Sequence, residues 1–166
     1  MSMWKNKAAF ARFLDQAVNN GNLKVVDEIF HQDFVGYLPD SADPARGRDG
    51  CRGWVQRLRE SFKDVNSLIE GGWLIGEVGT HEVGKGTVAQ RVAAFVVLRG
   101  THTGVFANVE ATRKRATWTE VHLLNFENGQ VIQDVVVRDT LSVLRQIGVT
   151  SLNQTSAPTI LPPVLI

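Results

Sequence analysis

The chain has 166 residues, of which 43% are hydrophobic and 21% are charged, and its formal net charge is +1. These values are typical of one globular domain, and the near-neutral charge argues against nucleic acid or an anionic membrane as a partner, because both favour a basic stripe. A single cysteine, Cys51, excludes an internal disulfide framework. The sequence shows neither a signal peptide nor an apolar run of the ~20 residues that span a bilayer, so we expect a cytoplasmic protein.

The first third of the chain predicts three helices. Asn6 is a candidate cap for the first, in which apolar residues recur with a 3.6-residue period until Asn20-Gly21 ends it. A shorter helix follows around Val26. After a loop rich in Asp, Gly and Pro, Asp49 is a candidate cap for a third helix. The expected buried stripe of this third helix consists of Cys51, Val55, Leu58 and Phe62.

The rest of the chain predicts mainly strands. Ser67–Ile75 and Val88–Leu98 are candidate strands, and a hairpin with Asn128-Gly129 at its turn precedes a short closing helix. Helices followed by strands predict an α+β domain, with three amino-terminal helices packed on one face of a curved antiparallel sheet. We expect this domain to occupy residues 1–150, and an apolar, proline-containing tail to occupy residues 151–166.

Polar residues inside the hairpin strands are the main functional signal. Glu120, His122 and Asp134 interrupt apolar runs, where an unpaired charged group costs several kcal/mol. A two-residue loop places His122 opposite Val135 and puts Asp134 on the other face of the sheet. A three-residue loop, with Gly129 left-handed, places His122 directly across from Asp134. The sequence leaves both registers open. In the second register one face holds Trp118, Glu120, His122, Leu124, Ile132, Asp134, Val136 and Arg138.

Other motifs indicate little chemistry. The stretch Gly79–Gly86 nearly matches a phosphate-binding loop, but its last glycine stands where a Ser or Thr is needed, and a strand follows. The four histidines lack metal-ligand spacing, so we expect no metal and no cofactor. His102 fits a residue that ties its turn to a neighbouring loop, and Asp139 fits a helix cap. The central histidine–aspartate pair fits either an active pair or a satisfied cross-strand contact.

The order and spacing of several short motifs resemble the SnoaL-like polyketide cyclase family, within the nuclear transport factor 2-like fold. The motifs are Asn20-Gly21-Asn22-Leu23, Asp33-Phe34, Arg99–Gly104, Trp118, Val121-His122-Leu123, Asn128-Gly129, Asp139 and Leu144–Gly148. The resemblance implies a cone-shaped barrel with a hydrophobic cavity and a homodimer formed through the sheet face. It also implies metal-free acid–base chemistry on a hydrophobic cyclic or aromatic carbonyl compound.

The resemblance further implies where a site would lie. The family's histidine falls on His122, its acid–base aspartate falls on Val136, and a nearby family histidine falls on Asp134. Valine transfers no proton, so three hypotheses stay open. The first is an enzyme in which Asp134 or Glu120 partners His122, and the second is a non-catalytic protein that binds a hydrophobic small molecule. The third is a purely structural protein that assembles into a dimer through its open sheet face. We predict His122, Asp134 and Glu120 as catalytic residues. The predicted ligand-binding residues are Tyr37, Trp54, Trp118, Val136, Arg138 and Asp139.

Overall fold

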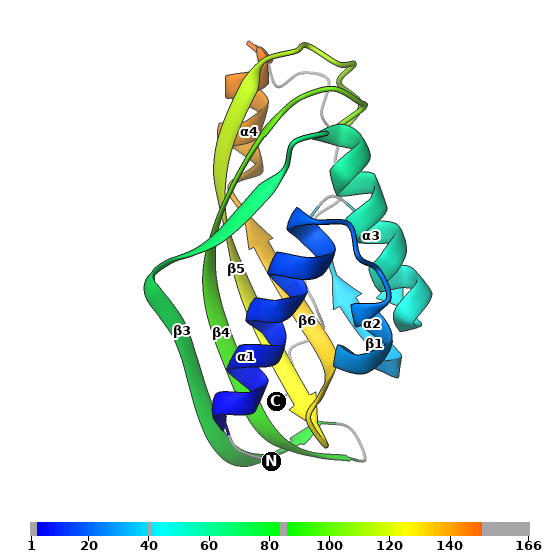
Figure 1. Ribbon diagram of the computed structural model, residues 1–166, viewed down its shortest axis with the longest axis vertical. Helices are drawn as coiled ribbons and strands as arrows, with labels where there is room; N and C mark the ends of the chain where they lie inside the picture. Colours follow the sequence, from blue (N-terminus) through cyan, green and yellow to red (C-terminus); the bar gives the residue numbers. More distant parts are fainter. Residues whose placement is uncertain (1–2, 40, 84–85, 151–166) are drawn as a thin grey trace.

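The computed structural model describes residues 3–39, 41–83 and 86–150, which form an α+β fold with helices on one face of a curved sheet (Figure 1). The helices are α1 (Met3–Phe13), the π-helical turn η1 (Leu14–Asn19), α2 (Val25–Ile29), α3 (Gly47–Ser61) and α4 (Thr140–Ile147). The strands are β1 (Phe30–Tyr37), β2 (Ala45–Arg46), β3 (Asn66–Val83), β4 (Gly86–Thr101), β5 (Arg115–Glu127) and β6 (Gln130–Arg138). This architecture confirms the predicted fold class.

The core lies between the helices and the inner face of the sheet, which is the face that the helices cover. Helix α1 packs on β3 and β4, and α3 packs on β1. The predicted apolar stripes are confirmed, because Phe10 and Phe13 of α1 and Val55 of α3 are fully buried. Along β4 and β5 buried and more exposed residues alternate, as the two-residue period of a strand requires.

Two predicted helix caps are wrong. Helix α1 begins at Met3, so Asn6 lies within it and donates its side-chain amide to Gln90. Helix α3 begins at Gly47, and Asp49 lies in its first turn, where its carboxylate accepts a hydrogen bond from Arg52 at 2.7 Å. Each polar side chain therefore has a partner that the local capping pattern did not reveal.

Strand β1 was not predicted, and it changes the character of the sheet. The strand order is β2-β1-β6-β5-β4-β3, and β1 pairs in parallel with β6, with Gly36 beside Asp134. The sheet is thus mixed rather than wholly antiparallel. Within the described residues β2 and β3 are its two edges, so the expected barrel is not closed. The strand β4 that begins at Gly86 confirms that the preceding glycine-rich stretch does not lead into a helix.

The hairpin between β5 and β6 follows neither predicted register. Asn128 and Gly129 have φ values of 50° and 83° and form a two-residue loop, with Glu127 opposite Gln130. One extra residue, Ile132, then bulges out, because Phe126 pairs with Val131 whereas Asn125 pairs with Gln133. The bulge shifts the register by one residue.

The shifted register restores the predicted face. His122 pairs with Val136 and Leu124 pairs with Asp134, so His122 and Asp134 point to the same side of the sheet. The prediction that Ile132 also lies on this face is wrong, because Val131 is the buried residue before the bulge.

The closing helix α4 confirms its predicted ends. Asp139 is its N-cap and accepts a hydrogen bond from the backbone N–H of Ser142 at 3.0 Å. Gly148, with a φ of 108°, ends it in the left-handed conformation. Across the described part of the chain, none of the helices has the length and apolarity needed to cross a membrane. The predicted tail, residues 151–166, lies outside the described residues.

Candidate functional site

Four charged or titratable side chains meet on the inner face of the hairpin. Glu120 and His122 come from β5, and Asp134 and Arg138 come from β6. Only 1% of Glu120, 1% of His122, 3% of Asp134 and 8% of Arg138 is exposed. Such groups are rarely this buried unless they are paired.

The four side chains form one hydrogen-bonded cluster. His122 Nδ1 lies 2.8 Å from Asp134 Oδ2, and His122 Nε2 lies 3.3 Å from Glu120 Oε2. The other oxygen of Glu120 accepts hydrogen bonds from Arg138 Nε at 2.6 Å and from Trp118 Nε1 at 3.0 Å. Both nitrogens of the imidazole are therefore occupied by carboxylates.

The contact between His122 and Asp134 is diagonal across the strand pair. The residue directly opposite His122 is Val136, which is 4% exposed. Diagonal neighbours on a sheet lie within reach of long side chains, and valine is too short to reach past the imidazole. The position to which the resemblance assigns an aspartate is thus the one that faces the imidazole most directly.

Aromatic rings from the helices enclose the imidazole. The ring of Phe10 in α1 lies 5.0 Å from the ring of His122, and that of Trp54 in α3 lies 6.1 Å from it, both measured between centroids. Phe13 stacks on Trp54 at 6.1 Å. Periodicity predicted Phe10 and Phe13 as core residues, but nothing in the sequence indicated that this core faces His122.

The cluster fixes the charge of its members. Burial alone lowers the pKa of His122, but the charge and hydrogen bond of Asp134, with those of Glu120, outweigh it and raise the pKa to about 10. Burial raises the pKa of Glu120, but Arg138 and His122 together lower it to about 2. At neutral pH the imidazole is a cation between two carboxylates, so it cannot accept a further proton.

Two buried polar atoms beside the imidazole have no partner. One is Asp134 Oδ1 and the other is Trp54 Nε1. Cys51 lies one turn before Trp54 on the buried face of α3. Burial and then the charge of Asp134 raise the pKa of its thiol, so Cys51 stays neutral and is a poor nucleophile.

The other predicted site residues divide into two groups. Trp118 and Arg138 join the cluster through Glu120, and the Arg138 guanidinium also lies 5.6 Å from the centroid of the Phe106 ring. Tyr37 pairs with Val135 on the opposite face of the sheet from Asp134, so the structure does not bring it to the imidazole. Asp139 is exposed at the start of α4, where it caps the helix.

His102 lies outside this cluster and has the tying role that was predicted. It is fully buried, its Nδ1 lies 3.1 Å from Thr112 Oγ1, and its backbone bonds Arg113 and Lys114. These contacts hold together the base of the loop between β4 and β5. Burial lowers the pKa of His102, so its imidazole is neutral.

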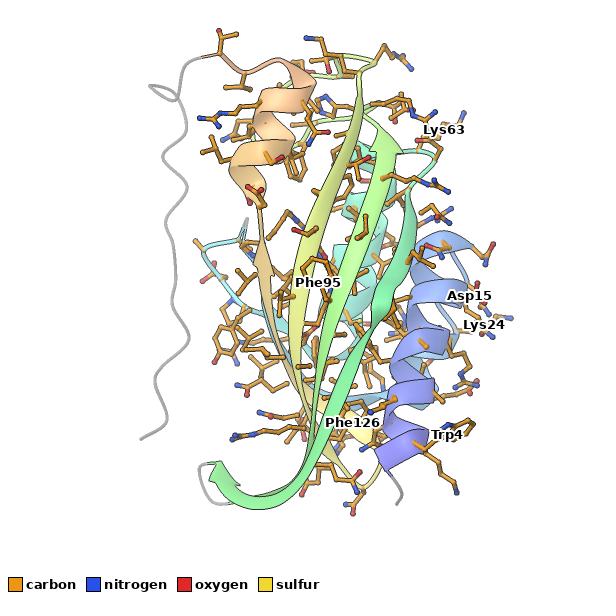
Figure 2. All side chains as sticks on the ribbon, turned by 90° about the vertical axis from the view of Figure 1, so that its left-hand side faces the viewer. Trp4, Asp15, Lys24, Lys63, Phe95 and Phe126 are labelled. Carbon is orange, nitrogen blue, oxygen red and sulfur yellow. The ribbon has the colours of Figure 1, made fainter. Side chains whose placement is uncertain are left out.

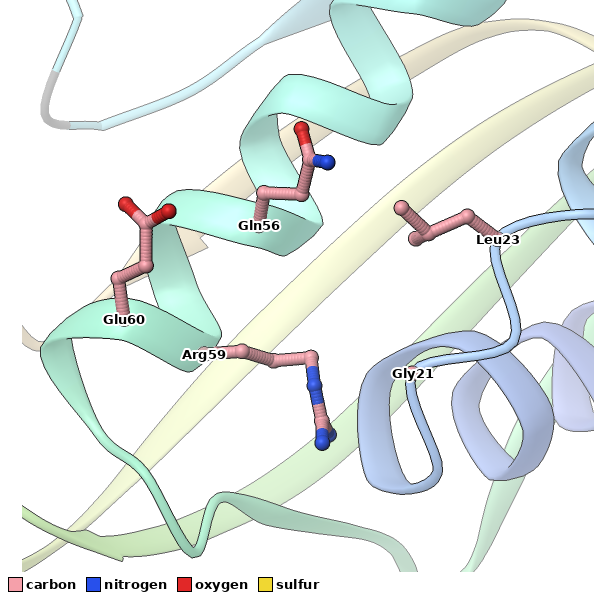
Figure 3. A pocket seen from close by; sticks show the side chains of 5 residues that line it. All are labelled: Gly21, Leu23, Gln56, Arg59 and Glu60. Carbon is pink, nitrogen blue, oxygen red and sulfur yellow. The ribbon is translucent and has the colours of Figure 1, made fainter.

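A groove of about 240 Å³ lies elsewhere, between α3 and the turn after η1 (Figure 3). Arg59, which borders it, donates to the carbonyls of Val18 and Asn19 at 2.5 and 2.8 Å. This groove is a seam between two helical segments and contains none of the predicted site residues. Among the residues whose side chains are described, no group of three or more His, Cys, Asp or Glu has a metal-binding arrangement.

The sequence model of the SnoaL-like polyketide cyclases matches residues 8–147. The chain belongs to this family. No curated protein sequence matches the SnoaL-like chain. Many solved structures share its fold, and the three described next are less than 25% identical to it, so they support the fold alone.

Three solved structures illustrate the likeness of this SnoaL-like protein. TsrD from Streptomyces laurentii superposes with a TM-score of 0.71 at 20% identity, over 89% of this chain and 98% of its own. A SnoaL-like polyketide cyclase from Agrobacterium tumefaciens gives 0.68 at 18%, over 89% and 100%. AclR from Streptomyces galilaeus, a proposed hydroxylase, gives 0.65 at 22%, over 89% and 98%.

Proposed function

We propose that this SnoaL-like protein is a metal-free acid–base enzyme that moves a proton on the carbon next to the carbonyl of a hydrophobic cyclic or aromatic compound. The observation that supports it is the asymmetry of Asp134. One carboxylate oxygen is held by the His122 cation, whereas the other, Oδ1, is buried without a partner. A buried acceptor is costly while it has no hydrogen-bond donor, and a bound ligand can supply one.

Asp134 is the base in this mechanism, and His122 positions it. The C–H bond next to the carbonyl breaks, the proton goes to Asp134 Oδ1, and the electron pair moves into the enolate. Asp134 then returns the proton to carbon or to oxygen. His122, charged and bonded on both nitrogens, holds the carboxylate in one orientation, and Glu120 holds His122. A positioned base contributes typically about 10² to 10⁴ in rate.

Proton exchange tests the mechanism without knowledge of the natural substrate. In D2O, the wild-type protein is expected to catalyse exchange of the α-protons of 2-tetralone, followed by proton NMR. Asp134→Asn is expected to reduce this rate at least about 100-fold, because an amide accepts no proton at neutral pH. Asp15→Asn, the same change at an exposed residue of η1, is the control. Equal rates in Asp134→Asn and wild type contradict the mechanism.

The alternative is a binding protein without catalysis, and Val136 favours it. Valine occupies the position directly across from His122, where the resemblance places the family's acid–base aspartate. Binding of 2-tetralone with no exchange above the uncatalysed rate supports this alternative.

We also propose that two copies pair through the outer face of the sheet. The centre of this face is uncharged and largely apolar, with Leu123 48% exposed and Val137 58% exposed on neighbouring strands (Figure 2 labels Phe95 on it). Large apolar patches are rare on monomers. Light scattering is expected to give the mass of a dimer for wild type and of a monomer for Val137→Glu. Val105→Glu, at an exposed loop residue, is the control. The patch comprises Ala93, Phe95, Val97, Thr119, Val121, Leu123, Val135 and Val137.

A further inference from the structure

The two unpartnered atoms beside the imidazole differ in kind. Trp54 Nε1 carries a proton and can only donate a hydrogen bond, whereas Asp134 Oδ1 accepts one. Trp54 is 7% exposed and Asp134 is 3% exposed, so bulk water does not satisfy either. An unpaired donor and an unpaired acceptor suit a ligand that has an acceptor for the indole N–H and a hydrogen for the carboxyl oxygen.

The side chains that bear these atoms both contact the imidazole of His122. The Trp54 ring meets the His122 ring in a T-shaped contact at 6.1 Å, and Asp134 bonds the same imidazole at 2.8 Å. Cys51 is on the same face of α3 as Trp54, and the charge of Asp134 contributes to the raised pKa of its thiol. Trp54 of α3 and Asp134 of β6 are therefore neighbours of the same imidazole, and each has one buried polar atom without a partner.

The chemistry of the pair restricts the ligand. An indole N–H is a neutral donor, which suits the oxygen of an uncharged carbonyl. Asp134 Oδ1 is a carboxyl oxygen that accepts hydrogen bonds, and it repels a ligand that is itself an anion. The rings of Phe10 and Phe13 add an apolar wall on the side of α1. A hydrophobic ketone fits these constraints, and a carboxylic acid of the same shape does not.

We propose that Trp54 Nε1–H binds the carbonyl oxygen of the substrate and that, with Asp134 Oδ1, it selects ketones that have a removable proton on the adjacent carbon. This inference rests on the proposed function. When the C–H bond breaks and its proton passes to Asp134 Oδ1, the carbon electron pair forms a C=C bond. The carbonyl π pair moves to oxygen, and the indole N–H donates to the oxygen that becomes negative. Trp54 is therefore a catalytic residue, because it contacts the reacting carbonyl.

An NMR titration tests the subsite. In 15N-labelled protein, the indole N–H signal of Trp54, assigned from its contacts with the Phe13 ring, is expected to move downfield on addition of 2-tetralone. Tetralin, which lacks the oxygen, and 2-naphthoate, which is an anion, are expected to cause no downfield shift. Absence of the shift with 2-tetralone overturns the proposal, whether the ketone binds elsewhere or does not bind.

Trp54→Phe separates the hydrogen bond from packing. Phenylalanine keeps a ring against Phe13 and His122 but removes the donor. The Kd of 2-tetralone is expected to rise about tenfold, and that of tetralin to change less than about twofold. Equal losses for both compounds overturn the proposal. Trp4→Phe, at an indole that is 75% exposed, is the matched control. If Trp54→Phe does not fold, the titration of the wild-type protein alone decides.

Asp134→Asn distinguishes failure of the subsite from failure of the proposed function. In that variant the rate of proton exchange is expected to fall at least about 100-fold, while 2-tetralone still shifts the Trp54 signal because the indole donor is intact. A shift together with exchange that is unaffected by Asp134→Asn refutes Asp134 as the base and leaves the ketone subsite standing. Loss of exchange in Asp134→Asn without any Trp54 shift refutes the subsite alone.

Discussion

Raising the pH from 7 to 9 is expected to destabilise the protein through one buried group. The pKa of His122 is raised from 6.5 to about 10 in the folded protein, because Asp134 and Glu120 flank the imidazole. Between these two values the folded protein holds a proton that the unfolded chain has released. The stabilisation is therefore complete below pH 6.5 and is lost as the pH rises towards 10.

The size of the effect follows from linkage. One extra proton in the folded state lowers the free energy of unfolding by about 1.4 kcal/mol for each pH unit. From pH 7 to pH 9 the loss is about 2 to 3 kcal/mol, a large part of the ~5 to 15 kcal/mol that holds typical domains folded. His122 is 1% exposed, so solvent screening does not reduce this figure much. The buried Cys51 thiol acts in the same direction only as the pH approaches the ordinary pKa of a thiol, about 8.5.

Urea unfolding at constant ionic strength, followed by tryptophan fluorescence at pH 7, 8 and 9, measures the change. His122→Gln is the control, because glutamine keeps hydrogen-bonding capacity but does not titrate. Subtracting its pH dependence also removes the contribution of Cys51. The reasoning is refuted if wild type loses less than about 0.5 kcal/mol over this range, or if His122→Gln shows the same slope as wild type.

Three further variants have expected outcomes. Val136→Asp places a third carboxylate across from His122 and is expected to destabilise the protein at pH 7 but less at pH 5; in urea unfolding, equal effects at both pH values contradict this expectation. If Asp134 is a base relocated from position 136, Val136→Asp is also expected to increase the rate at which the protons of 2-tetralone exchange. Deletion of Ile132 removes the bulge and keeps the residue pairs from Asn125–Gln133 to Glu120–Arg138. The His122 signals in NMR spectra are therefore expected to stay close to those of wild type. Loss of the folded spectrum contradicts the assigned register. Asp139→Ala is expected to cost about 1 kcal/mol in urea unfolding through loss of the cap on α4, and no loss contradicts that role.

Local sequence patterns predicted much of this architecture. The apolar period of α1 and α3, the alternation along β5 and the turn at Asn128-Gly129 each follow from backbone geometry over a few residues. The cap at Asp139 and the stop at Gly148 depend on neighbours in the sequence, and both are confirmed. Asn6 and Asp49 also matched a capping pattern, but neither caps its helix. Asn6 instead bonds Gln90, and Asp49 bonds Arg52.

The hairpin register shows where local patterns stop. The two-residue loop alone puts His122 and Asp134 on opposite faces, and the sequence carries no signal for a bulge at Ile132. One extra residue reverses the side of every residue beyond it, so the side on which Asp134 lies depends on which register buries more apolar surface and pairs more polar groups. Strand β1 was missed for a related reason, since its pairing with β6 joins residues about a hundred positions apart.

By itself, the sequence determined the α+β class, the family resemblance and the polar residues that stand out in apolar strands, because these depend on residue type and short periods. The tertiary structure decided that His122 bonds both Asp134 and Glu120, that Tyr37 lies on the other face, and that the indole of Trp54 and one oxygen of Asp134 remain open. Hydrogen bonds need atoms within about 3 Å, and that proximity comes from the packing of helices on the sheet.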